Sequence, residues 1–347
     1  MNESAAMECY APQGTQRQTM AQQFDGIVIS TKVDEPLARA VAGELGSPAE
    51  TFVDPGLRRF ENSEFGARIK GNVRRRDVYV IGSLCRDLSG LSTNDALMQL
   101  LVLVDALVRA SVNAITVIVP YLGYAKQERK KHGRQPISAK LIMDMLSLKP
   151  QVKRIVCMDL HAPAIQGFIN LPVDNISARP ALLNVLRRQG LVGDRVVVVS
   201  PDAGGAERAR EFQIRLKTGW AIMSKFRNSS NEVESVELIG NVKGKIAVIV
   251  DDMVQSGGTL FAAAMHLIEA GANRVVVVAT HADFCGKVAE KLSHSMVEQL
   301  IVTDTIPLVR QSDVASCSKI TIVPIQQVLS EAIRRIHFGE SLSELFD

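Results

Sequence analysis

The sequence contains few cysteines and none in a close pair. Five are spread over 347 residues, at positions 9, 85, 157, 285 and 317, and no Cys-X-X-Cys motif occurs. An odd number of scattered cysteines argues against a disulfide framework and is typical of proteins in a reducing compartment. The cysteine pattern therefore predicts buried, unpaired thiols in a cytoplasmic protein.

Long apolar runs and a strong net charge are missing as well. The longest candidate run, residues 97–104, is interrupted by Gln99 and falls far short of the ~20 residues that span a bilayer. A formal net charge of +3 is too small to indicate nucleic-acid binding by itself. Residues 1–25 have no long apolar stretch and a single arginine, so they resemble neither a signal nor a transit peptide, and we expect a disordered extension.

The composition that remains is that of a soluble globular protein, 46% hydrophobic and 22% charged. Short runs rich in Val and Ile alternate with amphipathic segments of helix length, which predicts an α/β protein with mainly parallel sheets flanked by helices on both faces. The predicted strands are residues 26–30, 77–81, 114–119, 154–158, 195–200, 245–250 and 274–280. The helix candidates include residues 94–110, capped by Ser92 or Thr93, and residues 138–148, 179–189 and 326–337.

The chain is too long for one ordinary core, so two domains are expected. The alternating pattern restarts after Pro172, which predicts an N-terminal α/β domain over residues 26–174 and a C-terminal α/β domain over residues 175–330. We expect the last residues, 331–347, to pack back on the N-terminal domain. No low-complexity linker separates the two halves, so close packing between them is expected.

Polar motifs follow the carboxyl ends of the predicted strands. In open α/β sheets this edge is where ligands bind. Five such motifs on one edge are hard to explain as turns alone, so the sequence predicts a ligand site there. The motifs are residues 120–127, 159–161, 200–205, 251–252 and His281.

The most informative motif begins with two adjacent carboxylates, Asp251 and Asp252, at the end of a β-branched run. A turn of small residues follows, and then an apolar segment of helix length. Backbone N–H groups around glycines and a helix N-terminus can hold a phosphate, while carboxylates accept hydrogen bonds from ribose hydroxyls. The paired aspartates therefore favour a sugar-phosphate site over an ordinary capped turn. The turn consists of Gln255, Ser256, Gly257, Gly258 and Thr259.

A divalent cation is the second chemistry that the strand ends indicate. Asp159 and His161 share one face of an extended segment, since strand side chains alternate, and Asp202 follows a later strand. Oxygen and imidazole ligands without thiolates suit a hard cation such as Mg²⁺, which keeps several waters and binds phosphates. Each residue also has an ordinary alternative role: a lone histidine is more often a hydrogen-bonded structural residue, and Asp202 could cap the helix expected after Gly205.

Two groups of cations could contact a polyphosphate. The basic run over residues 124–134 contains Gly133 and would be either a solvated loop or a flap that closes over phosphates; its aromatic residues are too sparse for a nucleic-acid patch. Lys225 and Arg227 share a face of an extended segment before a polar loop. Alone they would be a surface pair, but they could also clamp a transferring phosphoryl group.

Taken together, these motifs resemble the phosphate-dependent type of ribose-phosphate pyrophosphokinase, also called phosphoribosyl pyrophosphate synthetase. The resemblance runs from about residue 26 to the C-terminus, and its fragments are specific as a set. They are Arg59-Phe-Glu-Asn-Ser-Glu64, Tyr121-Leu-Gly-Tyr-Ala-Lys-Gln127, Pro136-Ile-Ser-Ala-Lys140, Met158-Asp-Leu-His-Ala162, Gln166-Gly-Phe168, Val173-Asp-Asn175, Ser200-Pro-Asp-Ala-Gly-Gly205, Asp251-Asp-Met253 and Glu331-Ala-Ile-Arg-Arg335.

The resemblance implies two phosphoribosyltransferase-like α/β domains and an enzyme, a ribose-phosphate diphosphokinase. Such an enzyme transfers the β,γ-diphosphate of ATP to the 1-hydroxyl of ribose 5-phosphate, giving AMP and the phosphoribosyl pyrophosphate used in nucleotide biosynthesis. The resemblance also implies Mg²⁺ as the cofactor and a homo-oligomer in which dimers assemble to a hexamer.

Roles for individual residues follow from the same resemblance. Lys225 and Arg227 would stabilise the transferred group, Asp251 and Asp252 would bind the ribose hydroxyls, and residues 255–259 would bind the 5-phosphate. Adenine would be held by residues reaching in from a neighbouring subunit, Phe60, Asn62 and Glu64. The remaining ATP contacts would be Lys126, Gln127 and His161. The metal candidates would be His161, Asp202, Asp159 and Asp174, and a regulatory phosphate site would include Arg74, Arg134, Ser341 and Ser343.

Several positions depart from the family pattern. Gln255 and Ser256 stand where the family has Asp-Thr. Lys126 stands where the family has Arg, and a lysine ammonium cannot make the bidentate hydrogen bonds of a guanidinium. Asn72 and Pro163 replace serines at the regulatory phosphate site, so regulation by phosphate and ADP stays open.

Three functions are therefore compared. An active synthetase is favoured because Lys225, Arg227 and the acidic motifs are retained. A non-catalytic regulatory subunit that associates with active synthetases is suggested by Gln255 and Lys126. A base-using phosphoribosyltransferase would explain the acidic pair and the turn, but not the Phe60 motif or the Lys225/Arg227 pair. No general base is evident, and positioning with charge stabilisation suffices for such a transfer.

Overall fold

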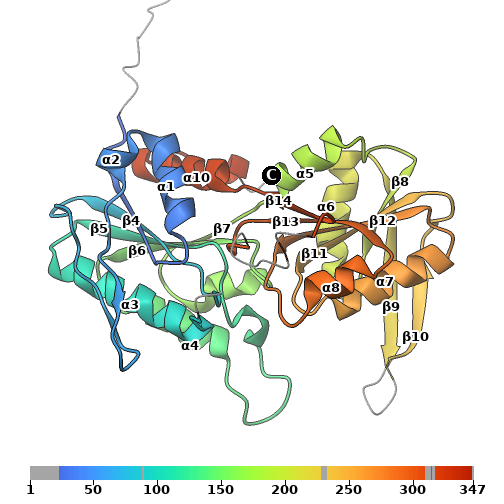
Figure 1. Cartoon of the computed structure of the whole chain (residues 1–347), viewed down its shortest axis with the longest axis horizontal. Helices are drawn as coiled ribbons and strands as arrows, with labels where there is room; N and C mark the ends of the chain where they lie inside the picture. The colour runs from blue at the N-terminus through green and yellow to red at the C-terminus, as the bar shows by residue number, and fades with distance from the viewer. Residues whose placement is uncertain (1–22, 88–89, 228–232, 309–313, 315–316, 346–347) are drawn as a thin grey trace, which may run out of the picture.

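Two sheets lie side by side, each with helices on both faces (Figure 1). The computed structural model describes residues 23–87, 90–227, 233–308, 314 and 317–345. The predicted extension over residues 1–25 lies outside these ranges except for residues 23–25.

The first sheet is fully parallel, with its strands in the order β1-β4-β5-β6-β7. Helices α1, α2 and α10 lie above it in Figure 1, and α3 and α4 lie below it. The strands are β1 (Ile27–Ser30), β4 (Asp77–Ile81), β5 (Ala114–Val119), β6 (Val152–Met158) and β7 (Val173–Ile176). The helices are α1 (Glu35–Leu45), α2 (Pro48–Thr51), α3 (Thr93–Arg109), α4 (Ser138–Leu146) and α10 (Gln326–Phe338).

The second sheet has its strands in the order β10-β9-β8-β11-β12-β13-β14, and only the β9–β10 pair is antiparallel. The strands are β8 (Val196–Ser200), β9 (Gly219–Arg227), β10 (Val233–Ile239), β11 (Ile246–Met253), β12 (Arg274–His281), β13 (Val297–Thr303) and β14 (Ile320–Val323). The helices around it are α5 (Arg179–Arg188), α6 (Ala206–Leu216), α7 (Gly258–Glu269) and α8 (Val288–Ser293). The predicted fold class is confirmed.

Short elements fill the connections. Within the described ranges they are a two-stranded hairpin and four 3₁₀ segments of one or two turns. They are β2 (Arg58–Arg59), β3 (Phe65–Gly66), η1 (Ala125–Gln127), η2 (Pro163–Phe168), η3 (Ala203–Gly205) and η4 (Ser343–Leu345).

The predicted helix boundaries rest on local chemistry that the structure bears out. Ser92 caps α3: its hydroxyl accepts a hydrogen bond from the backbone N–H of Asp95, and the Asp95 carboxylate accepts one from the N–H of Ser92. This reciprocal pair satisfies two N–H groups that a helix start leaves without partners. At the other end of the chain, α10 stops at Gly339, whose φ of +70° is the left-handed conformation that glycine adopts most easily.

Buried strand residues point alternately to the two faces of each sheet. In β1, Val28 packs in the same apolar cluster as α1 and α10, whereas Ile27 packs with α3 and α4. The first of these clusters continues past the end of the sheet into the second half, where it includes Leu182 of α5, Val198 of β8 and Phe212 of α6. The two halves therefore share part of one core.

Helix α10 belongs to this shared core although it follows the last strand of the second sheet. It packs against α1, and Figure 1 shows it above the first sheet. Ile333 on its buried face is fully enclosed. The predicted domain boundaries, and the tail predicted to begin at residue 331, stay predictions.

The described cysteines are all unpaired. Cys85 and Cys157 are buried, as predicted, while Cys285 and Cys317 are half-buried; Cys9 lies outside the described residues. Within the described parts of the chain, no helix is long and apolar enough to cross a membrane.

Candidate functional site

The carboxyl ends of the central strands from both sheets converge at the seam between the two halves. A cavity of about 270 Å³ there is lined by residues that follow β5, β6, β8 and β11. Four of the five predicted strand-end motifs therefore contribute to one cavity, as the sequence predicts. Its polar lining includes Lys126, His161, Asp202, Asp251, Asp252 and residues 255–259.

The small-residue turn between β11 and α7 has the geometry of an anion site. Gly257 is the N-cap of α7 and has φ of +73°, and a side chain there would collide with the Phe261 ring. Glycine is therefore required at this position on two grounds. The turn leads into the N-terminus of the twelve-residue helix α7, where backbone N–H groups and the helix dipole favour a negative group.

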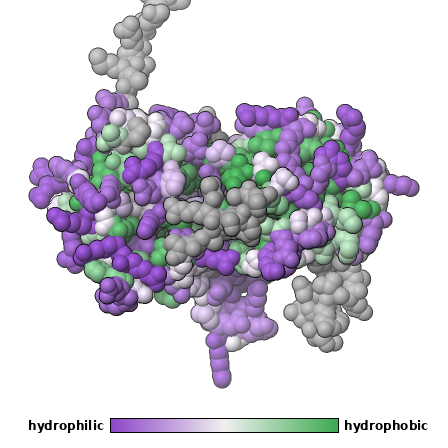
Figure 2. Space-filling view, in the orientation of Figure 1, coloured by the Kyte–Doolittle hydropathy of each residue, from purple (hydrophilic) through white to green (hydrophobic). Residues whose placement is uncertain are grey.

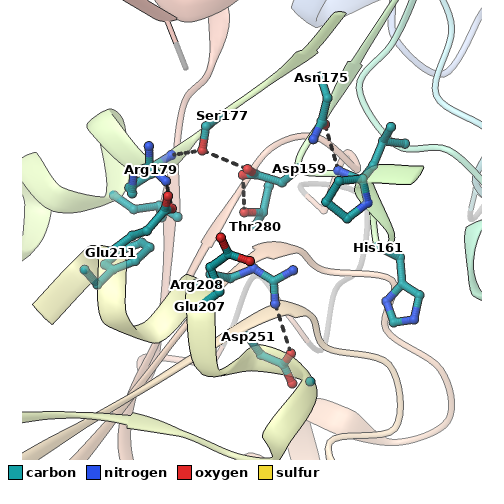
Figure 3. Close-up of a pocket in the computed structure, with 15 residues that line it drawn as sticks. Asp159, His161, Asn175, Ser177, Arg179, Glu207, Arg208, Glu211, Asp251 and Thr280 are labelled. Atoms are coloured by element: carbon teal, nitrogen blue, oxygen red, sulfur yellow. Dashed lines mark hydrogen bonds and ion pairs between the residues drawn. The ribbon is translucent and has the colours of Figure 1, made fainter. Parts of the chain in front are cut away.

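The acidic pair at the end of β11 is held in two different environments. Asp252 is 5% exposed, and its Oδ2 lies 2.5 Å from Nδ1 of His161. Asp251 accepts a hydrogen bond from the backbone N–H of Asp252 at 2.9 Å, and its Oδ1 lies 3.7 Å from Nη1 of Arg208. Figure 3, a close-up of the adjoining cavity, shows Arg208 reaching from α6 toward Asp251, with His161 on the right of the view.

These surroundings separate the acidities of the two carboxyls. Burial, and then the negative charge of Asp252, raises the pKa of Asp251 to about 7. Burial also acts to raise the pKa of Asp252, but the hydrogen bond to His161 and the charge of Arg208 outweigh it and hold that pKa below the usual range. Asp252 is therefore ionised at neutral pH, whereas Asp251 titrates near neutrality.

Asp159 has its carboxylate occupied by hydrogen bonds within the protein. Oδ1 accepts a bond from the hydroxyl of Ser177 at 2.8 Å; Oδ2 accepts one from the hydroxyl of Thr280 at 2.6 Å and one from the N–H of Ala178 at 3.0 Å. Figure 3 shows this cluster at the centre of a second cavity, of about 300 Å³. Because Thr280 belongs to β12 and Ser177 follows β7, Asp159 links the two halves.

The other metal candidates differ in position. Asp174 pairs with Arg154 and lines a separate hollow beside α10, so the structure does not bring it to His161. Asp202 caps η3, with Oδ1 accepting a bond from the N–H of Gly205 at 3.1 Å, and it lines the seam cavity as well. Among the described residues, no three His, Cys, Asp or Glu side chains are grouped closely enough to enclose a metal ion by themselves.

Lys126 and Gln255, two of the positions expected from the resemblance to depart from the family pattern, contact one another. The ammonium of Lys126 donates a hydrogen bond to Oε1 of Gln255 at 2.7 Å. Lys126 lies in η1, after β5 of the first sheet, and Gln255 lies in the turn after β11 of the second. Both line the seam cavity and also a neighbouring cavity of about 500 Å³ that extends to Gln127.

Residues predicted to hold adenine lie away from the seam of their own chain. Phe60, Asn62 and Glu64 belong to the β2–β3 hairpin, the blue loop at the lower left of Figure 1. The Phe60 ring is 38% exposed, and the guanidinium of Arg58 lies 4.3 Å from its centre. Within one chain, the structure therefore does not bring this hairpin to Lys126.

Two predicted residues cannot be placed relative to the seam by their side chains, and the regulatory candidates lie away from it. Lys225 and Arg227 end β9, and their side chains lie outside the described residues. The regulatory candidates are dispersed within one chain. Arg134 lies in the loop between η1 and α4, which projects downward in Figure 1, whereas Ser341 and Ser343 follow α10. Arg74 lies in the turn before β4, where its N–H donates to the side chain of Asn72.

Two residues at the seam were not predicted. Arg208 faces the acidic pair from α6, and Asp283 accepts hydrogen bonds from Gln255 and Tyr121. Arg208 gives no local signal, because only folding brings α6 to β11. Asp283 could have been found, since it lies two residues beyond His281 on the same strand-end pattern. His281, one of the five strand-end motifs, is buried and bonds to Thr305 and to the backbone carbonyl of Met158, so its imidazole has partners within the protein.

Comparison with known proteins identifies the family. The family model described as the N-terminal domain of ribose phosphate pyrophosphokinase matches residues 27–148, and the one described as a phosphoribosyl synthetase-associated domain matches residues 227–347. The chain belongs to the ribose-phosphate pyrophosphokinase family. The resemblance inferred from the motifs is thereby confirmed.

Individual relatives match over nearly their whole length. A ribose-phosphate pyrophosphokinase of Marinomonas sp. (strain MWYL1) is 42% identical over 322 residues, which cover 92% of this chain and 98% of the relative. Ribose-phosphate pyrophosphokinase A of Dictyostelium discoideum is also 42% identical, over 83% of this chain and 88% of its own. The crystal structure of phosphoribosylpyrophosphate synthetase from Mycobacterium smegmatis superposes with a TM-score of 0.82 at 32% identity, covering 91% of this chain and all of that one.

Proposed function

We propose that this chain is an active ribose-phosphate diphosphokinase. It transfers the diphosphate of ATP to the 1-hydroxyl of ribose 5-phosphate, giving phosphoribosyl pyrophosphate and AMP. The observation that carries this proposal is the seam cavity. There an acidic pair, with Asp252 buried and Asp251 half-buried, lies beside an anion-binding turn at a helix N-terminus and faces His161 and Lys126 from the other half. Family membership supports the same reaction.

Ribose 5-phosphate fits the side of the cavity made by β11 and α7. The 5-phosphate would bind at the turn over residues 255–259, where the helix N-terminus favours an anion. Asp251 and Asp252 would then accept hydrogen bonds from the ribose hydroxyls. Since both carboxylates are fixed by backbone and side-chain bonds, they need little rearrangement to receive the sugar.

ATP would enter from the opposite side of the seam. Lys126, Gln127 and His161 are the candidates for its phosphates, and the cavity of about 500 Å³ beside Lys126 offers space for them. Phe60, Asn62 and Glu64 would hold adenine from a neighbouring subunit, which fits the exposure of the Phe60 ring. The proposed working form is therefore a homo-oligomer.

The donors at the seam suit Mg²⁺ better than a soft metal. They are carboxylate oxygens and imidazole, with no thiolate lining the cavity. His161 and Asp202, two of the predicted metal candidates, line this cavity and would hold the ion, which would complete its coordination with water and phosphates. Bound there, Mg²⁺ would neutralise charge on the ATP phosphates.

The side chains would act by positioning the two substrates and by stabilising the negative charge on the transferred diphosphate. The transferred diphosphate moves in line from ATP to the ribose oxygen, and cations around it lower the energy of the transition state. Lys225 and Arg227 are the proposed residues for this role. Lys225→Ala should reduce kcat by roughly 10²-fold or more with a smaller effect on KM, as for other transition-state donors.

One assay tests the proposal. The purified protein is incubated with ATP, Mg²⁺ and ribose 5-phosphate, and AMP is measured, with Lys225→Ala as the matched control. Release of AMP by the natural protein, roughly 10²-fold or more faster than by Lys225→Ala, is the expected result. If the protein alone releases no AMP but changes the rate of an active synthetase mixed with it, the regulatory-subunit alternative suggested by Gln255 and Lys126 is correct.

A further inference from the structure

Four side chains form a hydrogen-bonded chain across the seam. The hydroxyl of Tyr121 donates to Oδ2 of Asp283 at 3.0 Å, and Nε2 of Gln255 donates to the same oxygen at 2.7 Å. Oε1 of Gln255 then accepts from Lys126 at 2.7 Å. Tyr121 and Lys126 come from the first half, and Asp283 and Gln255 from the second.

The polarity of this chain fixes the orientation of the Gln255 amide. An ionised carboxylate can only accept hydrogen bonds, and an ammonium can only donate them. With Asp283 on one side and Lys126 on the other, only one of the two amide orientations satisfies both neighbours. The carboxylate of Asp283 therefore determines that Gln255 presents its carbonyl oxygen, and not its NH₂ group, to Lys126.

Asp283 acts on the seam cavity from outside it. Lys126 and Gln255 line both the seam cavity and the neighbouring cavity of about 500 Å³, whereas Asp283 lines only the latter. Along this chain of hydrogen bonds, Lys126 contacts Gln255 directly, and the carboxylate of Asp283 lies one side chain beyond Gln255.

The loop that carries Asp283 is held in place without it. The N–H of Cys285 donates to the carbonyl of Gln255 at 3.2 Å, and the guanidinium of Arg86 bonds to the carbonyl of Phe284. The backbone next to Asp283 is therefore anchored to both halves by bonds that its side chain does not make. The side chain is only 2.7 Å from Gln255, so its contribution is to the orientation of that amide.

We propose that Asp283 is a positioning residue for the ATP phosphates, acting through Gln255 on Lys126. It holds the ammonium of Lys126 at the boundary of the two cavities until phosphate oxygens replace Gln255 as its acceptor. This inference rests on the proposed function, because it assigns the phosphates of ATP to Lys126.

A reciprocal exchange of amide and carboxylate tests this role with almost no change in volume. Asp283→Asn removes the charge that orients Gln255, and Gln255→Glu places two carboxylates in direct contact. Each single variant should raise KM for ATP by about five- to tenfold, with kcat changed by less than about threefold, as expected for a bond to a charged group. In the double variant the carboxylate at position 255 accepts hydrogen bonds both from Lys126 and from the amide at position 283. Its KM for ATP should therefore return to within about twofold of the natural value.

Two control variants separate positioning from loop anchoring. Tyr121→Phe removes the other hydrogen bond to Asp283 and should change KM for ATP by less than about twofold. Glu290→Gln removes an exposed carboxylate from the nearby helix α8 and should change nothing. If the double variant carries the summed cost of the two single variants, or if Tyr121→Phe matches Asp283→Asn, Asp283 is a structural residue and the proposal is wrong.

A binding measurement keeps this test distinct from the test of catalysis. Titration calorimetry of Mg²⁺ and a non-hydrolysable ATP analogue into the natural protein, the two single variants and the double variant should show the same loss and recovery of affinity. If the natural protein releases no AMP but the affinities follow this pattern, the positioning role holds and the catalytic proposal fails. If AMP is released and affinity does not recover in the double variant, the catalytic proposal holds and the positioning role fails.

Discussion

Asp251 and Asp252 are neighbours in the sequence but have different acidities in the fold. Both line the seam cavity, but Asp252 is buried and bonded to His161, whereas Asp251 is half-buried and lies slightly closer to Arg208, at 3.7 Å against 4.0 Å for Asp252. A carboxylate that is ionised accepts hydrogen bonds from sugar hydroxyls, whereas a protonated one also donates. The protonation of Asp251 therefore sets how well the proposed ribose site works.

The first prediction concerns the pH dependence of this site. The pKa of Asp251 is raised to about 7, so the carboxylate form increases as pH rises through that value, and KM for ribose 5-phosphate should fall from about pH 6 to about pH 8. Arg208 lowers the pKa of Asp251, so Arg208→Gln should move the fall in KM to higher pH. The measurement is KM against pH for both proteins; the substrate phosphate titrates identically in the two, and its contribution cancels in the difference. Superimposable profiles would remove Arg208 from the proposed site.

A second residue-scale prediction concerns stability. Burial, assisted by the charge of Asp34, raises the pKa of Asp304 to about 6. A raised carboxyl pKa means that ionisation costs the folded state more than the unfolded state, so stability present at low pH is lost as pH rises through about 6. Asp304→Asn keeps an oxygen that can accept from the N–H of Ile325 and removes this cost. It should be more stable than the natural protein by about 1–2 kcal/mol at pH 8 and nearly equal at pH 4.

Urea denaturation at the two pH values measures this difference. Asp54→Asn is the matched control, because ion pairing with Lys70 lowers the pKa of Asp54 and reverses the sign. That variant should lose stability at pH 8. A gain for Asp304→Asn that is the same at both pH values would show that its origin is not ionisation.

Much of the candidate site was predictable from single residues, and the exceptions have a common cause. Asp251, Asp252, His161 and the turn were found because strand ends and small-residue turns leave local signals. Arg208 reaches the acidic pair only through tertiary packing, which no local pattern reports. Asp159 was predicted as a metal candidate from its position at a strand end. The hydroxyls that donate hydrogen bonds to its carboxylate come from β12 and from the segment after β7, which no local pattern could report.

At the scale of elements, uniformly apolar strands and long amphipathic helices were predictable, and two-residue or interrupted strands were not. Strands with near-continuous apolar runs, such as β5, agree with the prediction, and α3 and α4 agree to within two residues at each end. The β2–β3 hairpin has only two residues in each strand, too few for a period to show. The four-residue strand β14 was not predicted either, although β1, which has the same length, was. In β13, Glu298 and Gln299 interrupt the apolar run.

The loop between η1 and α4 is the element with the clearest expected response to ligand. Residues 129–135 are exposed throughout, and the hydrophilic segment projecting below the molecule in Figure 2 corresponds to this loop. The amides of Lys131 and His132 donate only to the exposed side chain of Gln135. Such a segment opens easily, so its amides should exchange rapidly.

The third prediction is that this loop closes over nucleotide. Hydrogen exchange over residues 126–134 should slow when Mg²⁺ and a non-hydrolysable ATP analogue are added, because the phosphates give its cations partners. Exchange in β5, which is buried, should stay unchanged and serves as the internal reference. Equal exchange in the loop with and without saturating analogue would count against a closing flap.

At the scale of the whole molecule, the shared core determines how the chain unfolds. One apolar cluster includes Val28 of the first sheet, Val198 of the second and Ile333 of α10. Loss of any part of this cluster exposes apolar surface in both halves. We therefore expect the two sheets to unfold together, although each has a second apolar face of its own.

The last prediction tests this coupling with the single tryptophan as a local reporter. Trp220 lies in β9 of the second sheet, whereas Ile333 lies in α10, above the first. Ile333→Ala should lower the free energy of unfolding by about 2–5 kcal/mol, because a fully buried side chain is lost and a cavity is left. In urea at a fixed protein concentration, the midpoint from Trp220 fluorescence should fall together with the midpoint from far-ultraviolet circular dichroism. Leu141→Ala, at a side chain that is 59% exposed, should move neither midpoint appreciably. If Ile333→Ala splits the dichroism transition while the Trp220 midpoint keeps its natural value, the two halves are independent folding units, because a shared core cannot weaken on one side only.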